Sequence, residues 1–128
     1  LDITNSGSGS INALGLISTD AKVNVQGSGS LSLGAVNGNE LNVSVNGSGS
    51  VNASGNVRNL VANTHGSGSA QLSSVKSLSA DLSSFGSGSV HAAVSQNVNA
   101  QSNGSGSVTV YGNPAQRNVN GRRVNFVN

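Results

Sequence analysis

The chain has 128 residues, of which Gly, Ser and Asn account for 18, 25 and 19, and this composition excludes several classes of protein. One domain with a modest core is expected at this length. With no Cys there is neither a disulfide framework nor a thiolate metal site, and with no run of about 18 apolar residues no membrane span is predicted. Six Lys and Arg against four Asp and Glu give a net charge of +2, too small for a nucleic-acid-binding surface. The composition fits either a disordered linker or a repetitive extracellular β protein.

An internal repeat decides between these two classes. The tetrapeptide Gly-Ser-Gly-Ser begins at Gly7, Gly27, Gly47, Gly66, Gly86 and Gly104, at spacings of 20, 20, 19, 20 and 18 residues. A flexible linker has no reason to keep such a period, so the chain is predicted to fold as a repeat protein.

Each block is flanked by strictly alternating apolar residues. They stand six and four positions before the first glycine of a block, and four and six positions after it. In chain order they are Leu1, Ile3, Ile11, Ala13, Ala21, Val23, Leu31, Leu33, Leu41, Val43, Val51, Ala53, Leu60, Ala62, Ala70, Leu72, Ala80, Leu82, Val90, Ala92, Val98, Ala100, Val108 and Val110. The residues between them are polar except Val61. This period of two predicts a short β-strand before and after each block, with the apolar side chains facing a core.

The blocks themselves are predicted to be corners, with both glycines on the inward side. Glycine is needed where a backbone bends sharply or passes close to another segment. The segments between one pair of strands and the next, residues 14–20, 34–40, 54–59, 73–79 and 93–97, contain all the variation in repeat length and are expected to be loops. Each includes an apolar residue at a position that could close the core from a third side: Leu16, Val36, Val57, Val75 and Val94.

These features predict an all-β, single-domain parallel β-solenoid over residues 1–128, with about six to seven coils of 18–20 residues and Gly-Ser-Gly-Ser corners. Residues 1–113 form the regular coils. Residues 114–128 form an irregular C-terminal rung or a cap, in which Val119, Val124 and Phe126 resume the apolar pattern and Gly121-Arg122-Arg123 replaces the tetrapeptide.

The last block continues as Gly-Ser-Gly-Ser-Val-Thr-Val-Tyr-Gly-Asn-Pro (Gly104–Pro114), and with the preceding repeats it resembles the head GIN domain family of auto-transporter adhesins. The resemblance extends over the repeat. It implies a parallel β-helix, export from a bacterium and a role at the cell surface, and it brings no catalytic residues with it. Curli-type subunits repeat Gly, Asn and Gln at about this period and are a looser comparison.

No catalytic, cofactor or metal site is predicted. Asp2 and Asp81 share a column about four rungs apart, too far for an acid/base pair. His65 and His91 fall on outward positions of different columns, where solvated side chains are the expectation. Calcium-binding solenoids need an Asp in each repeat, and here that position holds Ser. The chain is therefore expected not to be an enzyme.

The two ends suggest a function. A solenoid has an unpaired strand edge at each end, and the first residues already occupy core columns. Net charge is −1 over residues 1–64 and +3 over residues 65–128. We expect head-to-tail assembly into an extracellular bacterial filament of matrix or adhesive function, with the partner being the chain itself. The expected interface residues are Leu1, Asp2, Ile3, Val119, Arg122, Arg123, Val124 and Phe126.

The alternative is a non-polymerising adhesin head that recognises glycan or protein through one face of the solenoid. Its outward patch would ideally be aromatic, and Phe85 and His65 are the nearest candidates, both in the position before a block. Either function requires an extracellular or cell-surface location, with the chain expected to be a mature form that starts at Leu1.

Overall fold

The computed structural model describes residues 2–14, 20–121 and 123–127, and within these ranges the chain forms β-strands and no helix. The strands are β1 (Asp2–Ser6), β2 (Ser10–Leu14), β3 (Asp20–Gly27), β4 (Ser30–Gly47), β5 (Ser50–Gly66), β6 (Ser69–Gly86), β7 (Ser89–Asn103), β8 (Ser107–Tyr111), β9 (Gln116–Gly121) and β10 (Val124–Val127). Every pairing between these described strands is parallel. They form a β-solenoid of about six turns, which confirms the predicted fold class.

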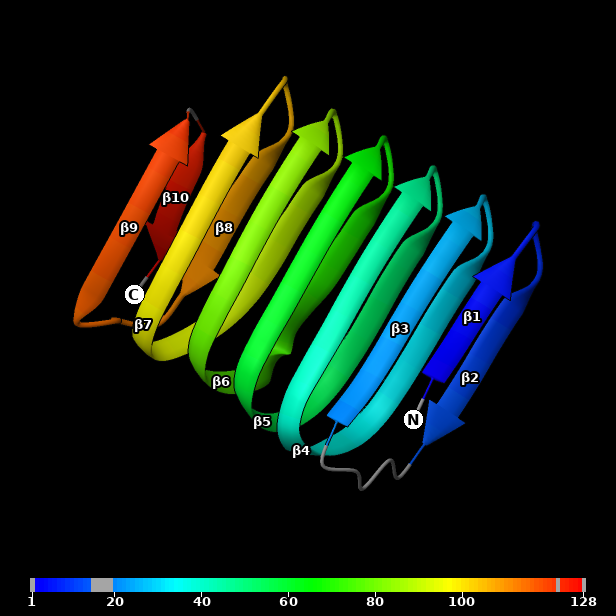
Figure 1. Ribbon diagram of the computed structural model, residues 1–128, viewed down its shortest axis with the longest axis horizontal. Coiled ribbons are helices and arrows are strands. Elements are labelled where there is room, and N and C mark those ends of the chain that lie inside the picture. The colour runs from blue at the N-terminus through cyan, green and yellow to red at the C-terminus, as the bar shows by residue number, and fades with distance from the viewer. Residues whose placement is uncertain (1, 15–19, 122, 128) are drawn as a thin grey trace.

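A complete turn of the solenoid consists of one long strand and one tight corner (Figure 1). β5 begins at Ser50 in the back layer, curves round the lower edge of the view and ends at Gly66 at the top of the front layer. A Gly-Ser-Gly-Ser corner at the upper edge then takes the chain into the back layer of the next turn. Two layers of strands therefore face each other across a thin core.

Successive turns stack in register, so equivalent residues of the repeat form columns along the solenoid axis. In the front layer Val23 pairs with Val43, Val43 with Ala62, Ala62 with Leu82 and Leu82 with Ala100. Neighbouring strands of a sheet lie about 4.8 Å apart, which sets the rise of each turn. The register follows the repeat length, as the spacing of the tetrapeptides predicts.

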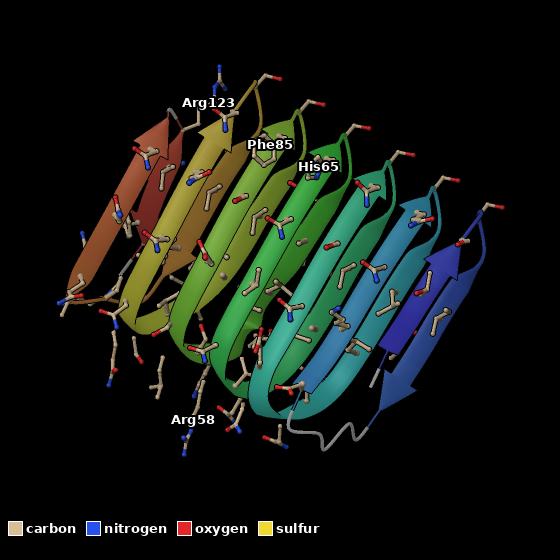
Figure 2. The ribbon with its side chains drawn as sticks, viewed as in Figure 1. Arg58, His65, Phe85 and Arg123 are labelled. Atoms are coloured by element: carbon tan, nitrogen blue, oxygen red, sulfur yellow. The ribbon has the colours of Figure 1, made fainter. Side chains whose placement is uncertain are left out.

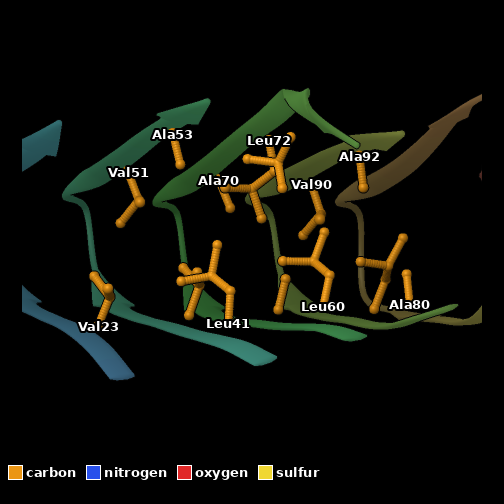
Figure 3. Packing of buried hydrophobic residues seen from close by; sticks show 14 of the residues in the cluster. Val23, Leu41, Val51, Ala53, Leu60, Ala70, Leu72, Ala80, Val90 and Ala92 are labelled. Atoms are coloured by element: carbon orange, nitrogen blue, oxygen red, sulfur yellow. The ribbon is translucent and has the colours of Figure 1, made fainter. Parts of the chain in front are cut away.

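The core is made of the alternating apolar residues (Figure 3). Among those whose side chains are described, all are buried except Ile3 and Ile11, which are half-buried in the first turn. Residues of different size stack along some columns, as where Leu72 lies between Ala53 and Ala92 in adjacent turns, whereas Leu41 pairs with Leu60 in another. Aliphatic side chains alone thus fill the narrow buried interior of the described turns.

A further inward column escaped the sequence analysis. It lies two residues before the first glycine of each block, and all six of its members are buried: Asn5, Val25, Val45, Thr64, Ser84 and Ser102. Three of its four polar members, Asn5, Ser84 and Ser102, donate hydrogen bonds to carbonyls of the corners. The hydroxyl groups of Ser84 and Ser102 each donate to the carbonyl of the second glycine of their own block, at 3.0 Å. Four of the six residues are polar, so the sequence pattern concealed a core position.

The two glycines of a corner have different roles, and the expectation that both face inward was wrong. The first glycine is exposed, with φ between +98° and +102°, a region that glycine enters without strain. The second is buried from Gly29 onward, and its N–H donates to the first glycine of the preceding block, as Gly68 does to the Gly47 carbonyl at 2.8 Å. A Cβ on Gly68 would overlap the carbonyl oxygen of Gly49. The positive φ of the first glycine interrupts the inward–outward alternation of the strand, so the two glycines of a corner differ in burial.

The lower edge, residues 34–40, 54–59, 73–79 and 93–97, is also strand rather than the expected loops. Unequal segment lengths are absorbed by shifts of register, for instance between Leu72 and Lys76 in the pairing of β6 with β7. The predicted third side of the core is confirmed for Val36, Val57, Val75 and Val94, which are all buried. Leu16 lies outside the described residues.

After Pro114 the chain continues both layers instead of folding across the end. β9 pairs with β7, and β10 pairs with β8. The corner of this last turn is short, because two residues separate Gly121 from Val124 where five separate Ser102 from Val108 one turn earlier.

Candidate functional site

The predicted interface residues of the N-terminal end lie on the first turn. Ile3 is half-buried in β1 and pairs with Val23 in the core column. Asp2 belongs to the same strand and pairs with Lys22 through its backbone. Leu1 lies outside the described residues. β1 and β2 each pair on one side only, with β3 and β4, among the strands described.

The predicted residues of the C-terminal end lie on the last turn. Val119 continues the column of Ala100 but is 40% exposed. Val124 and Phe126 continue the opposite layer and are half-buried. Arg123 is exposed at the final corner with φ of 61° (Figure 2), and Arg122 lies outside the described residues. The remaining interface residues thus fall on two opposite ends of the stack.

Arg117 occupies a core column that the sequence analysis did not assign to it. It pairs with Val98, and its guanidinium carbon lies 4.5 Å from the centroid of the Phe126 ring in the other layer. The Arg117 guanidinium also donates to Asn113 Oδ1 at 2.8 Å, and its Nε donates to the Pro114 carbonyl at 3.3 Å. These contacts close the lower half of the last turn.

Two pairs of rings stack on the outward surfaces. His65 and Phe85, in adjacent turns of the front layer, have centroids 5.0 Å apart and an interplanar angle of 30° (Figure 2). His91 and Tyr111 are 6.1 Å apart at 26°, with the Tyr111 hydroxyl 3.5 Å from His91 Nδ1. The aromatic candidates His65 and Phe85 are therefore partners of one another.

A hollow of about 480 Å³ opens on the lower edge, and we call it the lower-edge hollow. Its lining includes Val57, Arg58, Lys76, Leu78, Val94 and Tyr111. Leu78 is 42% exposed, unusual for a leucine in a chain with so few apolar residues at its surface. Volumes of this size are typical of small-ligand sites. Nothing in the sequence pattern indicated it, because its residues come from five turns of unequal length.

A second hollow, of about 740 Å³, lies on the lower part of the front layer. Amide and hydroxyl side chains dominate its lining, among them Asn59, Ser79 and Asn97. The Asn97 amide approaches the Ser79 hydroxyl at 3.5 Å, so part of this polar surface is already paired.

Among the residues described, no three His, Asp or Glu side chains come close enough together to hold a metal ion. The same part of the chain contains no helix long and apolar enough to cross a membrane.

Comparison with protein families matches residues 1–114 to the family described as "Putative auto-transporter adhesin, head GIN domain". The chain belongs to this family. A search of curated proteins found no match. The head GIN domain match ends at Pro114, so β9 and β10 lie beyond it while continuing the same solenoid. Membership indicates an adhesin-type domain at the cell surface or outside the cell, with partners on a surface.

Proposed function

We propose that this head GIN domain is a structural subunit of an extracellular filament, joined head to tail through its terminal turns, with a role in matrix formation or surface adhesion. The observation that carries the proposal is the pairing at the two ends. β1, β2, β9 and β10 each pair on one side only among the described strands, and all four run in the parallel sense of the stack. An open edge of this kind is a template for another strand.

In the proposed joint the columns of one copy continue into those of the next. Continuing them by one turn sets Ile3 of one copy on Val119 of the next in the front layer, and Ile11 on Val124 in the back layer. Each pair brings together apolar side chains that are exposed or half-buried in a single copy. Repetition of one such heterologous contact generates an open fibre.

Ladder hydrogen bonds and apolar burial supply most of the energy of this joint. An ion pair between Asp2 and Arg122 or Arg123 would add at most about 1 kcal/mol at an exposed position. The opposite net charges of the two halves, −1 and +3, favour the head-to-tail orientation over head-to-head contact.

Cysteine cross-linking tests the register directly, since the natural chain has no Cys. Thr4 and Asn120 occupy one outward column, so the joint sets them side by side in neighbouring copies. Under mild oxidation the double variant Thr4→Cys/Asn120→Cys is expected to form a ladder of covalent oligomers. The matched control Thr4→Cys/Asn63→Cys keeps one cysteine in mid-stack and is expected to give no ladder.

Electron microscopy of the unmodified chain provides the second readout. Unbranched filaments with a subunit rise of about 30 Å, or six to seven strand spacings, are expected. Ile3→Asp should abolish them while the β signal in circular dichroism remains. Single particles at high concentration, together with equal cross-linking in both double variants, would overturn the filament.

The second candidate is a non-polymerising adhesin head that binds glycan or protein through one face. The lower-edge hollow favours it, because the hollow is concave and partly apolar and none of its lining residues belongs to the terminal edge strands β1, β2, β9 and β10. A monomeric chain that still binds a surface ligand would establish this function.

A further inference from the structure

The lower-edge hollow owes its shape to the unequal repeat lengths. Lys76, Ala93 and Tyr111 follow one another in a single column across three turns. The backbones that carry Lys76 and Tyr111 are two strand spacings apart, roughly 10 Å. Ala93 lies between them, and because its side chain is small it leaves a gap between the side chains of Lys76 and Tyr111. The segment around Ala93 belongs to the shortest spacing between tetrapeptides, of 18 residues, which follows one of 20.

The floor of the gap is small and largely apolar. Val57, Ser77 and Val94 follow one another in the neighbouring column, and all three are buried. The Ser77 hydroxyl is already used, since it donates to the Ala93 carbonyl at 2.7 Å. A ligand in the hollow therefore rests on a flat surface of methyl groups and paired backbone.

The walls differ in chemistry. On one side stands Tyr111, whose ring is held by stacking on His91. On the other side the exposed cations Lys76 and Arg58 line the rim, and Arg58 extends outward from the lower edge in Figure 2. Leu78 adds an exposed apolar side chain. No Asp or Glu side chain in the described part of the chain lines this hollow.

This combination favours a flat molecule with one apolar face and a negative charge. A pyranose ring presents C–H groups on its face, which pack against an aromatic ring, and a uronic acid adds a carboxylate for Lys76 and Arg58 to bind. Asn56 and Ser95, exposed at the same rim, provide polar groups for sugar hydroxyls.

An extended acidic peptide fits less well. Peptides bind to sheets by adding a strand to an open edge, whereas the backbone of β5, β6 and β7 at this site is paired on both sides. A peptide would have to rely on side chains alone.

We propose that the lower-edge hollow binds an acidic polysaccharide, with a uronic acid residue over Ala93 between Tyr111 and the cations Lys76 and Arg58. The site goes beyond the proposed filament and does not depend on it, because none of its residues belongs to a terminal edge strand.

Titration calorimetry with oligogalacturonate, with neutral malto-oligosaccharide of equal length and with polyglutamate tests the site. The acidic sugar is expected to bind at least tenfold more tightly than either comparison ligand. Lys76→Asn, which introduces the residue found at position 56 of the same column, and Tyr111→Ala should each weaken binding about tenfold. Tyr111→Phe keeps the ring and should bind normally.

Lys22→Asn is the matched control for charge. It removes the same charge from the front layer, where Asn42 is the natural neighbour in the column, and should leave affinity unchanged. Equal losses in Lys22→Asn and Lys76→Asn, or equal binding of polyglutamate and oligogalacturonate with no effect of Tyr111→Ala, would overturn the sugar site. Absence of oligogalacturonate binding would do the same, whether or not filaments form.

Discussion

The guanidinium of Arg117 lies over the ring of Phe126, 4.5 Å from its centroid, and joins the two layers of the last turn. Both residues stand in core columns, above Val98 and Val110. The Arg117 side chain is itself exposed, so it covers the end of the core where the regular apolar pattern stops.

Removal of this contact is expected to loosen the last turn alone. A cation–π contact contributes about 1 kcal/mol, so Arg117→Ala should speed amide exchange in β9 and β10 about fivefold and leave β5 unchanged. Arg117→Leu is the matched control, because leucine fills the same column at position 60. Its amide exchange in β9 and β10 should increase less than that of Arg117→Ala. Unchanged exchange in Arg117→Ala would show that the contact contributes nothing.

Thr64→Val is expected to stabilise the fold. Thr64 is fully buried, its Oγ1 is the single buried side-chain polar atom without a hydrogen-bond partner in the described chain, and Val45 precedes it in the same column. Removing an unsatisfied hydroxyl should raise the free energy of unfolding by about 1 kcal/mol in urea titrations.

Ser84→Ala, in the same column as Thr64, is expected to change the free energy of unfolding in the opposite direction. The Ser84 hydroxyl donates to the Gly88 carbonyl at 3.0 Å, so its loss should lower the free energy of unfolding by about 1 kcal/mol. If both substitutions changed stability in the same direction, the assigned hydrogen bonding of this column would be wrong.

Gly68→Ala should be far more damaging than a substitution at its neighbour. The added Cβ would overlap the backbone of the preceding corner, at Gly49, and the ladder of corners leaves it little room to move. A loss of about 3 kcal/mol is expected, at the upper end for overpacking. Ser67→Ala, at an exposed position one residue earlier, should unfold at the same urea concentration as the unmodified chain.

Two leucines of β6 allow the stability contribution of a buried side chain to be compared with that of an exposed one. Leu72 is fully buried whereas Leu78 is 42% exposed on the same strand. Leu72→Ala should cost about 3 kcal/mol by leaving a cavity between Ala53 and Ala92, and Leu78→Ala should change stability by less than about 0.5 kcal/mol. Thermal unfolding of both variants provides the comparison, and similar losses would contradict the assigned layers.

The alternation of apolar and polar residues predicted the strands, their parallel stacking and most of the core, because one face of every strand is buried. It failed where burial and polarity coincide. The column of Thr64 and Ser84 has the polar sequence of a surface position although both residues are buried, and the burial of the Ser84 hydroxyl is explained only by the corner carbonyl to which it donates.

The lower edge and the last turn were less predictable for a different reason. Segments 73–79 and 93–97 differ in length, so which residues become neighbours depends on where each strand shifts its register. The same holds for Arg117, whose column becomes recognisable only when the short final corner is known. Sequence periodicity fixes positions within a repeat, while a site formed across unequal repeats needs the three-dimensional register.

The register shifts of the lower edge have a consequence for how such proteins diversify. A repeat can gain or lose a residue or two there, as the 18-residue and 20-residue repeats do, while the glycine corners and the core columns stay aligned. Insertions at this edge would therefore reshape the outer surface at little cost to folding, so recognition can evolve separately from stability, and the lower edge is the natural place to graft new binding loops.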